Sequence, residues 1–336
     1  MDNGASHGGE AAGTRPRSVA ELVASLPGSA AALGRLLTFV EQGGERAHEV
    51  GRALLGRGGN AYTLGITGAP GAGKSTLTTR VVGALRAGGH RVAVLAIDPS
   101  SPFSGGALLG DRVRMVDHSL DDGVFIRSMA TRGSLGGLAA AAPEAVRVLD
   151  AAGFDHVLLE TVGVGQIELE VAAVADTTLV VVNPGWGDHV QAAKAGLLEI
   201  ADVFAVNKAD RGGGRETRRM LRDMLRLRRT ETGGWEPPIV ETSATEGSGI
   251  DELLAEVDAH RQWLAAQGEL ERRRGERLWS EVERLFLLHV ADRSRALAPF
   301  HGSEELRKQV LAGETEPWAA AELLAERILP AAAPAD

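Results

Sequence analysis

Short apolar runs and amphipathic segments alternate along the middle of the chain. Several of the runs are continuous stretches of Val, Leu and Ile, which is typical of strands buried on both faces of a parallel sheet. The predicted strands are Tyr62–Thr67, Arg91–Ile97, Gly123–Arg127, His156–Glu160, Thr178–Asn183, Val203–Asn207 and Ile239–Thr242.

Segments with apolar residues at helical spacing separate these runs. The predicted helices include Thr76–Ala87, Leu135–Ala151, Val190–Ile200, Arg215–Leu227 and Ile250–Ala266. Such alternation predicts an α/β fold over residues 61–267, with a doubly wound, mainly parallel sheet that binds its ligand at the carboxyl ends of the strands.

The segments on either side of this domain have a different pattern. Residues 1–17 are rich in Gly, Ala and Ser without periodicity, so we expect disorder there. The pattern predicts N-terminal helices over residues 18–60 and a charged helical region over residues 268–329. A loose tail is expected over residues 330–336. The helices expected here are Val19–Leu26, Ala30–Leu55 with a break at Gly43-Gly44, Glu269–Val290, Ser303–Ala312 and Trp318–Ile328.

The composition of the chain excludes or disfavours several classes of function. The chain has 336 residues and no cysteine, which excludes disulfides, thiolate metal sites and a cysteine nucleophile. A net charge of −9 argues against general nucleic-acid binding, which requires a basic surface. The sequence has no apolar run long enough for a membrane span and no signal-peptide core, so we expect a cytoplasmic protein.

A phosphate-binding loop stands between the first strand of this domain and the next helix. Its residues fit G-x-x-x-x-G-K-[ST], and a strand–turn–helix context presents backbone N–H groups to a phosphate. Lys74 is expected to reach the β- and γ-phosphates as a catalytic residue, and the Ser75 hydroxyl to bind Mg²⁺. The predicted nucleotide contacts here are Gly68, Ala69, Pro70, Gly71, Ala72, Gly73, Lys74, Ser75 and Thr76.

Two later loops point to guanine. The tetrad N-K-x-D follows a strand at Asn207, Lys208 and Asp210. A carboxylate only accepts hydrogen bonds, so Asp210 can bind both N1–H and the 2-amino group of guanine, a donor pair that adenine lacks. The residues Ser243, Ala244 and Thr245 follow another strand and could supply a backbone N–H to guanine O6. The alternative for Asp210 is a helix N-cap before Arg215.

Three acidic residues near the phosphate loop are candidates for the metal site. Asp98 follows the strand 91–97, Asp111 lies in a Gly-rich continuation, and Glu160 closes the strand 156–160. The strand-end carboxylates of Asp98 and Glu160 can hold Mg²⁺, and Asp111 could be a second outer-sphere ligand. The N–H of Gly163 can contact the γ-phosphate. The alternative for Asp98 and Asp111 is a turn residue or a surface ion pair.

Candidates for catalysis lie in two further loops. Gln166 is the one residue after Glu160 that could orient a water. Asp188, Gln191 and Lys194 lie three residues apart after the strand 178–183, which places them on one side of a helix start. Polar residues at this spacing are also typical of a solvated face, and the spacing leaves both interpretations open.

Together these motifs resemble the MeaB/ArgK family, P-loop GTPases of the SIMIBI class related to the human methylmalonic aciduria type A protein. The resemblance runs from about Leu33 to Val290. It comprises GxPGxGKST at 68–76, DPSS at 98–101, GG..LGD..RM at 105–115, ETVGVGQ.E at 160–168, GxGD..QA.KAG.LEIAD at 185–202 and NKAD at 207–210.

The resemblance implies a magnesium-dependent GTPase that acts as a chaperone of an adenosylcobalamin-dependent acyl-CoA mutase. Such a protein gates cofactor delivery from a cobalamin adenosyltransferase, protects or reactivates the mutase, and forms a homodimer through its C-terminal helices. The resemblance also assigns Asp188, Gln191 and Lys194 to a switch loop that couples mutase binding to hydrolysis. The chain departs from the family at Ile167, Pro102-Phe103 and Trp186.

Two other functions are alternatives for a sequence with these motifs. A nickel metallochaperone GTPase of the same class needs Cys and His ligands, and this chain has no cysteine and scattered histidines. A module that binds GTP without hydrolysing it stays open. The arginines at 272–274 and 277 are expected to form a solvated helix face, and Trp235, Trp263, Trp279 and Trp318 to pack helices or interfaces.

Overall fold

Seven parallel strands form one sheet in the computed structural model, which describes residues 18–99, 120–131, 137–161, 167–185, 191–227, 234–297 and 303–328. The order across the sheet is β3-β2-β4-β1-β5-β6-β7, and each described pair is parallel. The strands are β1 (Tyr62–Gly68), β2 (Val92–Pro99), β3 (Val124–Thr131), β4 (His156–Thr161), β5 (Thr177–Val182), β6 (Val203–Val206) and β7 (Ile239–Glu241).

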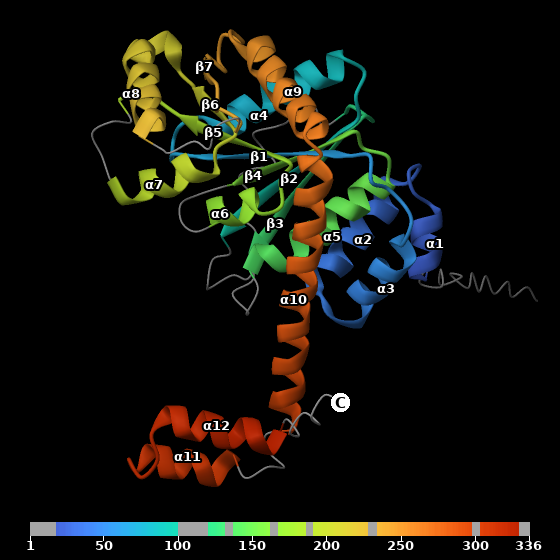
Figure 1. Cartoon of the computed structure of the whole chain (residues 1–336). Coiled ribbons are helices and arrows are strands. Elements are labelled where there is room, and N and C mark those ends of the chain that lie inside the picture. The colour runs from blue at the N-terminus through green and yellow to red at the C-terminus, as the bar shows by residue number, and fades with distance from the viewer. Residues whose placement is uncertain are drawn as a thin grey trace, which may run out of the picture.

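Helices cover both faces of the sheet (Figure 1). Those that connect the strands or follow the last one are α4 (Lys74–Ala87), α5 (Gly137–Ala151), α6 (Ile167–Ala172), α7 (Gln191–Ile200), α8 (Gly214–Leu227) and α9 (Ile250–Ala266). One core joins Ile66 and Val94 to α4 and α9, while Leu95 and Leu159 face α5 on the other side. The predicted doubly wound α/β fold with a parallel sheet is therefore confirmed.

The N-terminal helices pack on the same face as α5. They are α1 (Val19–Ala24), α2 (Ala30–Gln42) and α3 (Gly44–Leu54), and they share a buried cluster with α5. The chain turns at Gly43 with φ 71°, as the expected break required. Helix α1 ends before the predicted Leu26, since a residue that precedes a proline disfavours helical angles.

Several predicted boundaries were wrong by a few residues. Strand β2 continues through Asp98 to Pro99, so Asp98 lies inside the strand rather than after it. Strand β4 ends at Thr161 rather than Glu160. The short helix α6 begins at Ile167, inside a segment that was expected to be a loop.

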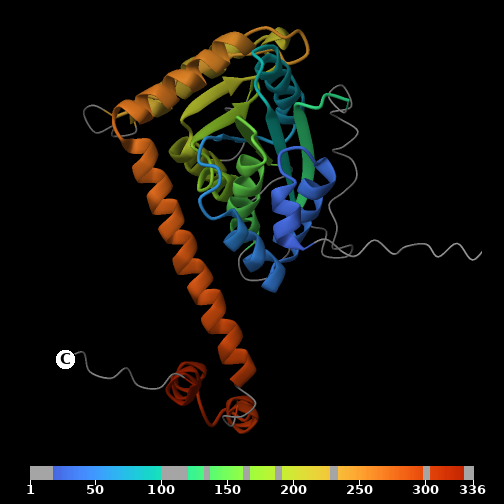
Figure 2. The same ribbon diagram turned by 90° about the vertical axis from the view of Figure 1, so that its right-hand side faces the viewer.

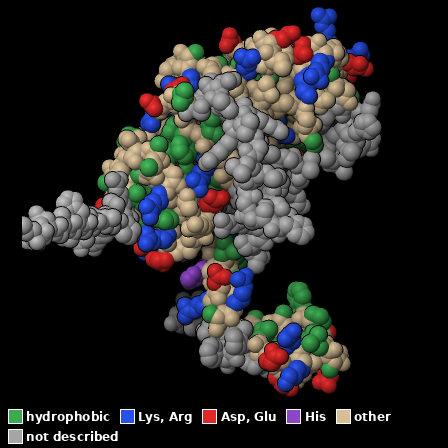
Figure 3. Space-filling model, turned by 180° about the vertical axis from the view of Figure 1, so that it is seen from behind, with side chains coloured by type: hydrophobic (Ala, Val, Ile, Leu, Met, Phe, Trp, Pro, Cys, Tyr) green, Lys and Arg blue, Asp and Glu red, His purple; other side chains and the backbone are tan. Residues whose placement is uncertain are grey.

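The C-terminal region extends away from the sheet domain as one long helix that carries a helical hairpin at its far end (Figures 1 and 2). It consists of α10 (Glu269–Leu297), α11 (Ser303–Leu311) and α12 (Pro317–Ile328). Seen from behind, the hairpin shows hydrophobic side chains among charged ones (Figure 3). Within the described residues, no helix combines the length and apolar character needed to cross a bilayer.

The base of α10 is bound to the sheet by a buried ion cluster. Asp176, which is 1% exposed, accepts from Arg274 Nη2 at 2.6 Å and from Arg277 Nη2 at 2.5 Å. Its Oδ2 also accepts the N–H of Thr63 in β1 at 3.0 Å. The expectation that these arginines only form a solvated face was wrong, because their partner lies far away in the sequence.

A buried histidine joins α9 to the sheet. His260 is 0% exposed, and its Nδ1 lies 2.6 Å from Thr177 Oγ1. The rings of Trp235 and Trp263 lie beside it, with centroids 4.8 Å and 6.1 Å away, so these two tryptophans do pack elements together. Burial, assisted by the charge of Arg273, lowers the pKa of His260 to about 4.

We expect the free energy of unfolding to fall as the pH drops from about 6.5 to about 4. In that range the unfolded chain binds a proton at His260 while the folded protein does not, which gives a slope of up to about 1.4 kcal/mol per pH unit. When the free energy of unfolding is measured with urea at several pH values in this range, it should change less steeply with pH in His260→Gln than in the wild type. His156, whose pKa burial also lowers to about 4, contributes equally to both proteins. Equal slopes would contradict the assignment.

Candidate nucleotide-binding site

The phosphate loop connects β1 to α4 and depends on glycine at its two ends. Gly68 has φ 130°, and a Cβ there would lie 2.0 Å from the carbonyl oxygen of Val181 in β5. Gly73 has φ 90°, and a Cβ there would lie 2.6 Å from the side-chain nitrogen of Asn207. Side chains at either position would therefore force apart the strands or the loops that shape the site.

Lys74 begins α4 and is 8% exposed. Its Nζ donates to the carbonyl oxygens of Gly68 at 2.9 Å and Ala69 at 3.2 Å. Burial lowers the pKa of Lys74, while the charges of Glu160 and Glu168 act in the opposite direction. The ammonium group thus lies inside the loop, where its charge can act on a bound phosphate with little screening by water.

Two side-chain oxygen atoms that could bind a metal ion lie next to each other beside this loop. Ser75 Oγ donates to Glu160 Oε1 at 2.5 Å, and Glu160 is 1% exposed. Strand pairing fixes the position of the carboxylate, because Glu160 of β4 lies opposite Ile66 of β1. A hydroxyl and a carboxylate are ligands that Mg²⁺ prefers, so the pair fits the predicted metal site. The described residues contain no cluster of three or more His, Asp or Glu suited to a metal.

Asn207 joins the phosphate loop to the two base loops. It is 1% exposed, its Nδ2 donates to the Ala72 carbonyl at 2.8 Å, and its Oδ1 accepts the N–H of Ala244 at 3.0 Å. Lys208, at φ 63°, donates from Nζ to the Gly71 carbonyl at 2.6 Å. The three loops therefore form one connected unit at the carboxyl edge of the sheet.

Asp210 is exposed beside this unit, in the short 3₁₀ turn Ala209–Arg211. Helix α8 begins at Gly214, and Asp210 makes no side-chain hydrogen bond to the part of the chain that the structure describes. The N-cap interpretation of Asp210 is therefore not supported, and its carboxylate is accessible to a ligand.

Part of the predicted site lies outside the described residues. This applies to Asp111, Gly163, Gln166 and Asp188. Asp98 lies in β2, and Gln191 and Lys194 in α7, but only their backbone is described. The roles predicted for these residues stay predictions.

Arg80 of α4 was not singled out from the sequence. Its Nε donates to the Ala244 carbonyl at 2.8 Å and its Nη2 to the Thr245 carbonyl at 2.9 Å. Nothing in the local pattern identifies this contact, because the partners are more than 160 residues apart in the chain.

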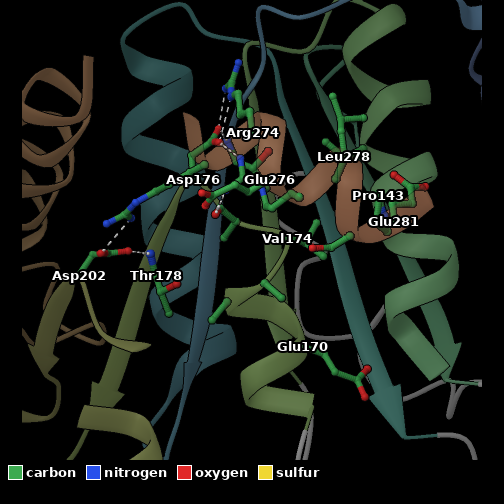
Figure 4. A pocket seen from close by; sticks show the side chains of 18 of the residues that line it. Pro143, Glu170, Val174, Asp176, Thr178, Asp202, Arg274, Glu276, Leu278 and Glu281 are labelled. Carbon is green, nitrogen blue, oxygen red and sulfur yellow. Dashed lines mark hydrogen bonds and ion pairs between the residues drawn. The ribbon is translucent and has the colours of Figure 1, made fainter. Parts of the chain in front are cut away.

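A cavity of about 1120 Å³ lies on the opposite side of the sheet domain, bounded by α5, α6 and α10 (Figure 4). The figure shows Asp176 and Arg274 joined by an ion pair, with Asp202 bound to Thr178 nearby. None of the lining residues belongs to the phosphate loop or the base loops. The cavity is therefore separate from the candidate nucleotide site.

Comparisons with known proteins agree on one family. The family model described as "Methylmalonyl Co-A mutase-associated GTPase MeaB" matches residues 33–298. A protein of Pyrococcus abyssi named as a GTPase is 47% identical over 304 residues, covering 90% of this chain and 94% of that protein. The mitochondrial methylmalonic aciduria type A homolog of Mus musculus is 34% identical over 320 residues, covering 88% of this chain and 76% of that protein.

A solved structure supports the same relationship. The crystal structure of an LAO/AO transport system kinase superimposes with a TM-score of 0.67 at 26% identity, covering 93% of this chain and 98% of that one. The similarity therefore includes the sheet domain and most of the C-terminal region.

Proposed function

Because the chain belongs to the MeaB family of P-loop GTPases, we propose that it hydrolyses GTP to GDP and phosphate as a chaperone of an adenosylcobalamin-dependent acyl-CoA mutase. The client is methylmalonyl-CoA mutase or a close relative. In this role the protein gates loading of the cobalamin cofactor from an adenosyltransferase and protects or reactivates the mutase. The description of the matching family as a mutase-associated GTPase supports this proposal.

The bridge made by Asn207 carries the assignment to a guanine nucleotide. One side chain binds the phosphate loop at Ala72 and the base loop at Ala244, so the two loops lie side by side and one ligand can contact both. Asp210 lies exposed at the base end of this span, and Lys74 lies at the phosphate end. A guanine nucleotide carries N–H donors on its base that match the carboxylate of Asp210, and negatively charged phosphates that match the ammonium group of Lys74.

Hydrolysis is attack of water on the γ-phosphate. Lys74 and the loop N–H groups stabilise the charge that develops on the phosphate oxygens. Ser75 and Glu160 would hold Mg²⁺, which neutralises phosphate charge when bound. Gly163 binds the γ-phosphate and Gln166 orients the water in this scheme. Asp188, Gln191 and Lys194 connect the mutase to the reaction.

The protein is proposed to be a homodimer through its C-terminal helices. Large apolar side chains on this region are exposed: Trp279 is 65%, Phe286 63% and Trp318 73% exposed. Leu278, Val282 and Leu285 add to the apolar surface of α10. Monomeric proteins rarely expose patches of this kind, and a second copy would cover them.

A kinetic assay of the full-length protein tests the proposal. We expect hydrolysis of GTP, with little hydrolysis of ATP, that is slow alone and accelerates when the acyl-CoA mutase of the same organism is added. Fast hydrolysis without any effect of the mutase would overturn the gating role. Binding of GTP without product in a single-turnover measurement would instead support a non-hydrolysing module.

The variant Asp210→Asn is the matched test of base recognition within this assay. An amide can donate a hydrogen bond, so it suits xanthine, which carries a carbonyl oxygen where guanine carries its amino group. The variant should therefore prefer XTP to GTP. An unchanged preference for GTP would show that Asp210 does not bind the base.

A further inference from the structure

Arg80 connects the phosphate-binding helix to the last base loop. It lies in α4, the helix that begins with Lys74, and its guanidinium binds two consecutive carbonyl oxygens, those of Ala244 and Thr245, at 2.8 Å and 2.9 Å. Arginine is a planar fork of donors, so two contacts from one side chain fix both the position and the orientation of the peptide groups that it binds.

Among residues 243–247, the hydrogen bonds leave one backbone donor for a ligand. The N–H of Ser243 donates to the Ser248 carbonyl at 3.0 Å, that of Ala244 to Asn207 at 3.0 Å, and that of Glu246 to Ser243 Oγ at 3.4 Å. Within the described residues, the N–H of Thr245 has no acceptor. Thr245 itself is exposed, whereas Ala244 is 3% exposed.

Peptide geometry sets the direction of that donor. In a planar trans peptide the carbonyl and the following N–H point to opposite sides. Because the Ala244 carbonyl points to Arg80, the Thr245 N–H points away from α4, on the open side of the loop. Arg80 therefore binds one side of this peptide group, while the N–H on the other side remains accessible to a ligand.

We propose that Arg80 is a positioning residue for guanine recognition, which aims the Thr245 N–H at O6 of the base. This inference rests on the proposed binding of a guanine nucleotide and adds a residue to it. Since Lys74 and Arg80 belong to the same helix, one rigid element sets both the phosphate position and the position of the O6 donor.

Binding of three nucleotides to Arg80→Met tests the proposal. GDP carries O6, 6-thio-GDP replaces it with sulfur, a weak acceptor, and IDP keeps O6 but lacks the 2-amino group that Asp210 binds. Calorimetry with Mg²⁺ should show that the variant weakens GDP binding by about tenfold, the effect of one misplaced hydrogen bond. The preference for GDP over 6-thio-GDP should shrink, and the preference for GDP over IDP should stay unchanged.

Arg86→Met is the matched control. Arg86 lies on the same helix but binds Asp121 and the His90 carbonyl, away from the base loops. We expect it to leave all three affinities unchanged. If Arg80→Met weakens all three nucleotides by the same factor, or none of them, the positioning role is wrong. If the wild-type protein does not bind GDP, the proposed function itself fails.

Discussion

Replacing Lys74 with methionine is expected to lower kcat for GTP hydrolysis by about 10²- to 10³-fold, the usual cost of losing one buried donor at the reacting group. Methionine keeps the length of the side chain but removes its charge. Lys74 is 8% exposed and held by the carbonyls of Gly68 and Ala69, so its charge acts inside the loop with little screening by solvent. The loss should therefore appear in the chemical step as well as in nucleotide affinity.

Single-turnover hydrolysis with saturating GTP separates these two effects. Lys308→Met is the control, because Lys308 lies on α11 with its side chain 68% exposed, far from the site. This control should hydrolyse GTP at the wild-type rate. A Lys74→Met protein that retains more than about a third of the wild-type rate would show that Lys74 does not stabilise the transition state.

Replacing Asp176 with asparagine is expected to lower the free energy of unfolding by about 3–5 kcal/mol, because it leaves two guanidinium groups without their buried anion. Burial alone raises the pKa of Asp176, but the hydrogen bond and charge of Arg274, with Arg277 and the Thr63 N–H, outweigh it and hold that pKa below its usual value. The folded protein therefore needs the charged form. An amide N–H would meet arginine donors instead of accepting from them.

Urea unfolding followed by circular dichroism measures this effect. Asp292→Asn offers the comparison on the same helix, since the pair of Asp292 with Arg295 is 74% and 61% exposed. Exposed pairs contribute only about 0–1 kcal/mol, so this variant should unfold almost as the wild type does. If both variants lose the same small amount, the cluster does not hold α10 on the sheet.

The strands and most helices could be predicted because their signals are local. Short apolar runs, several of them continuous, identified all seven strands. Helix α9 has the predicted bounds because Gly249, in a left-handed conformation, and Gly268 mark its ends. Helix α6 was missed because it is short and its first five residues alternate between apolar and acidic, which is the period of a strand rather than of a helix.

The site was predictable where a motif carries the chemistry and not where distant residues meet. Motif spacing led to Asn207, Ser75 and Glu160, which the structure brings together around the phosphate loop. The contacts of Arg80 with Ala244 and of Arg274 with Asp176 cannot be predicted from spacing, because a surface arginine on a helix looks the same in the sequence whether or not it has a partner.

Asp176 binds both the start of β1 and the base of α10, so a rotation of the strand at this point would be transmitted to the long helix. With 29 residues it is about 44 Å long, so a rotation of about 5° at its base displaces the α11–α12 hairpin by about 4 Å. The other end of strand β1 leads into the phosphate loop. Small changes in strand tilt are therefore amplified at the farthest part of the molecule.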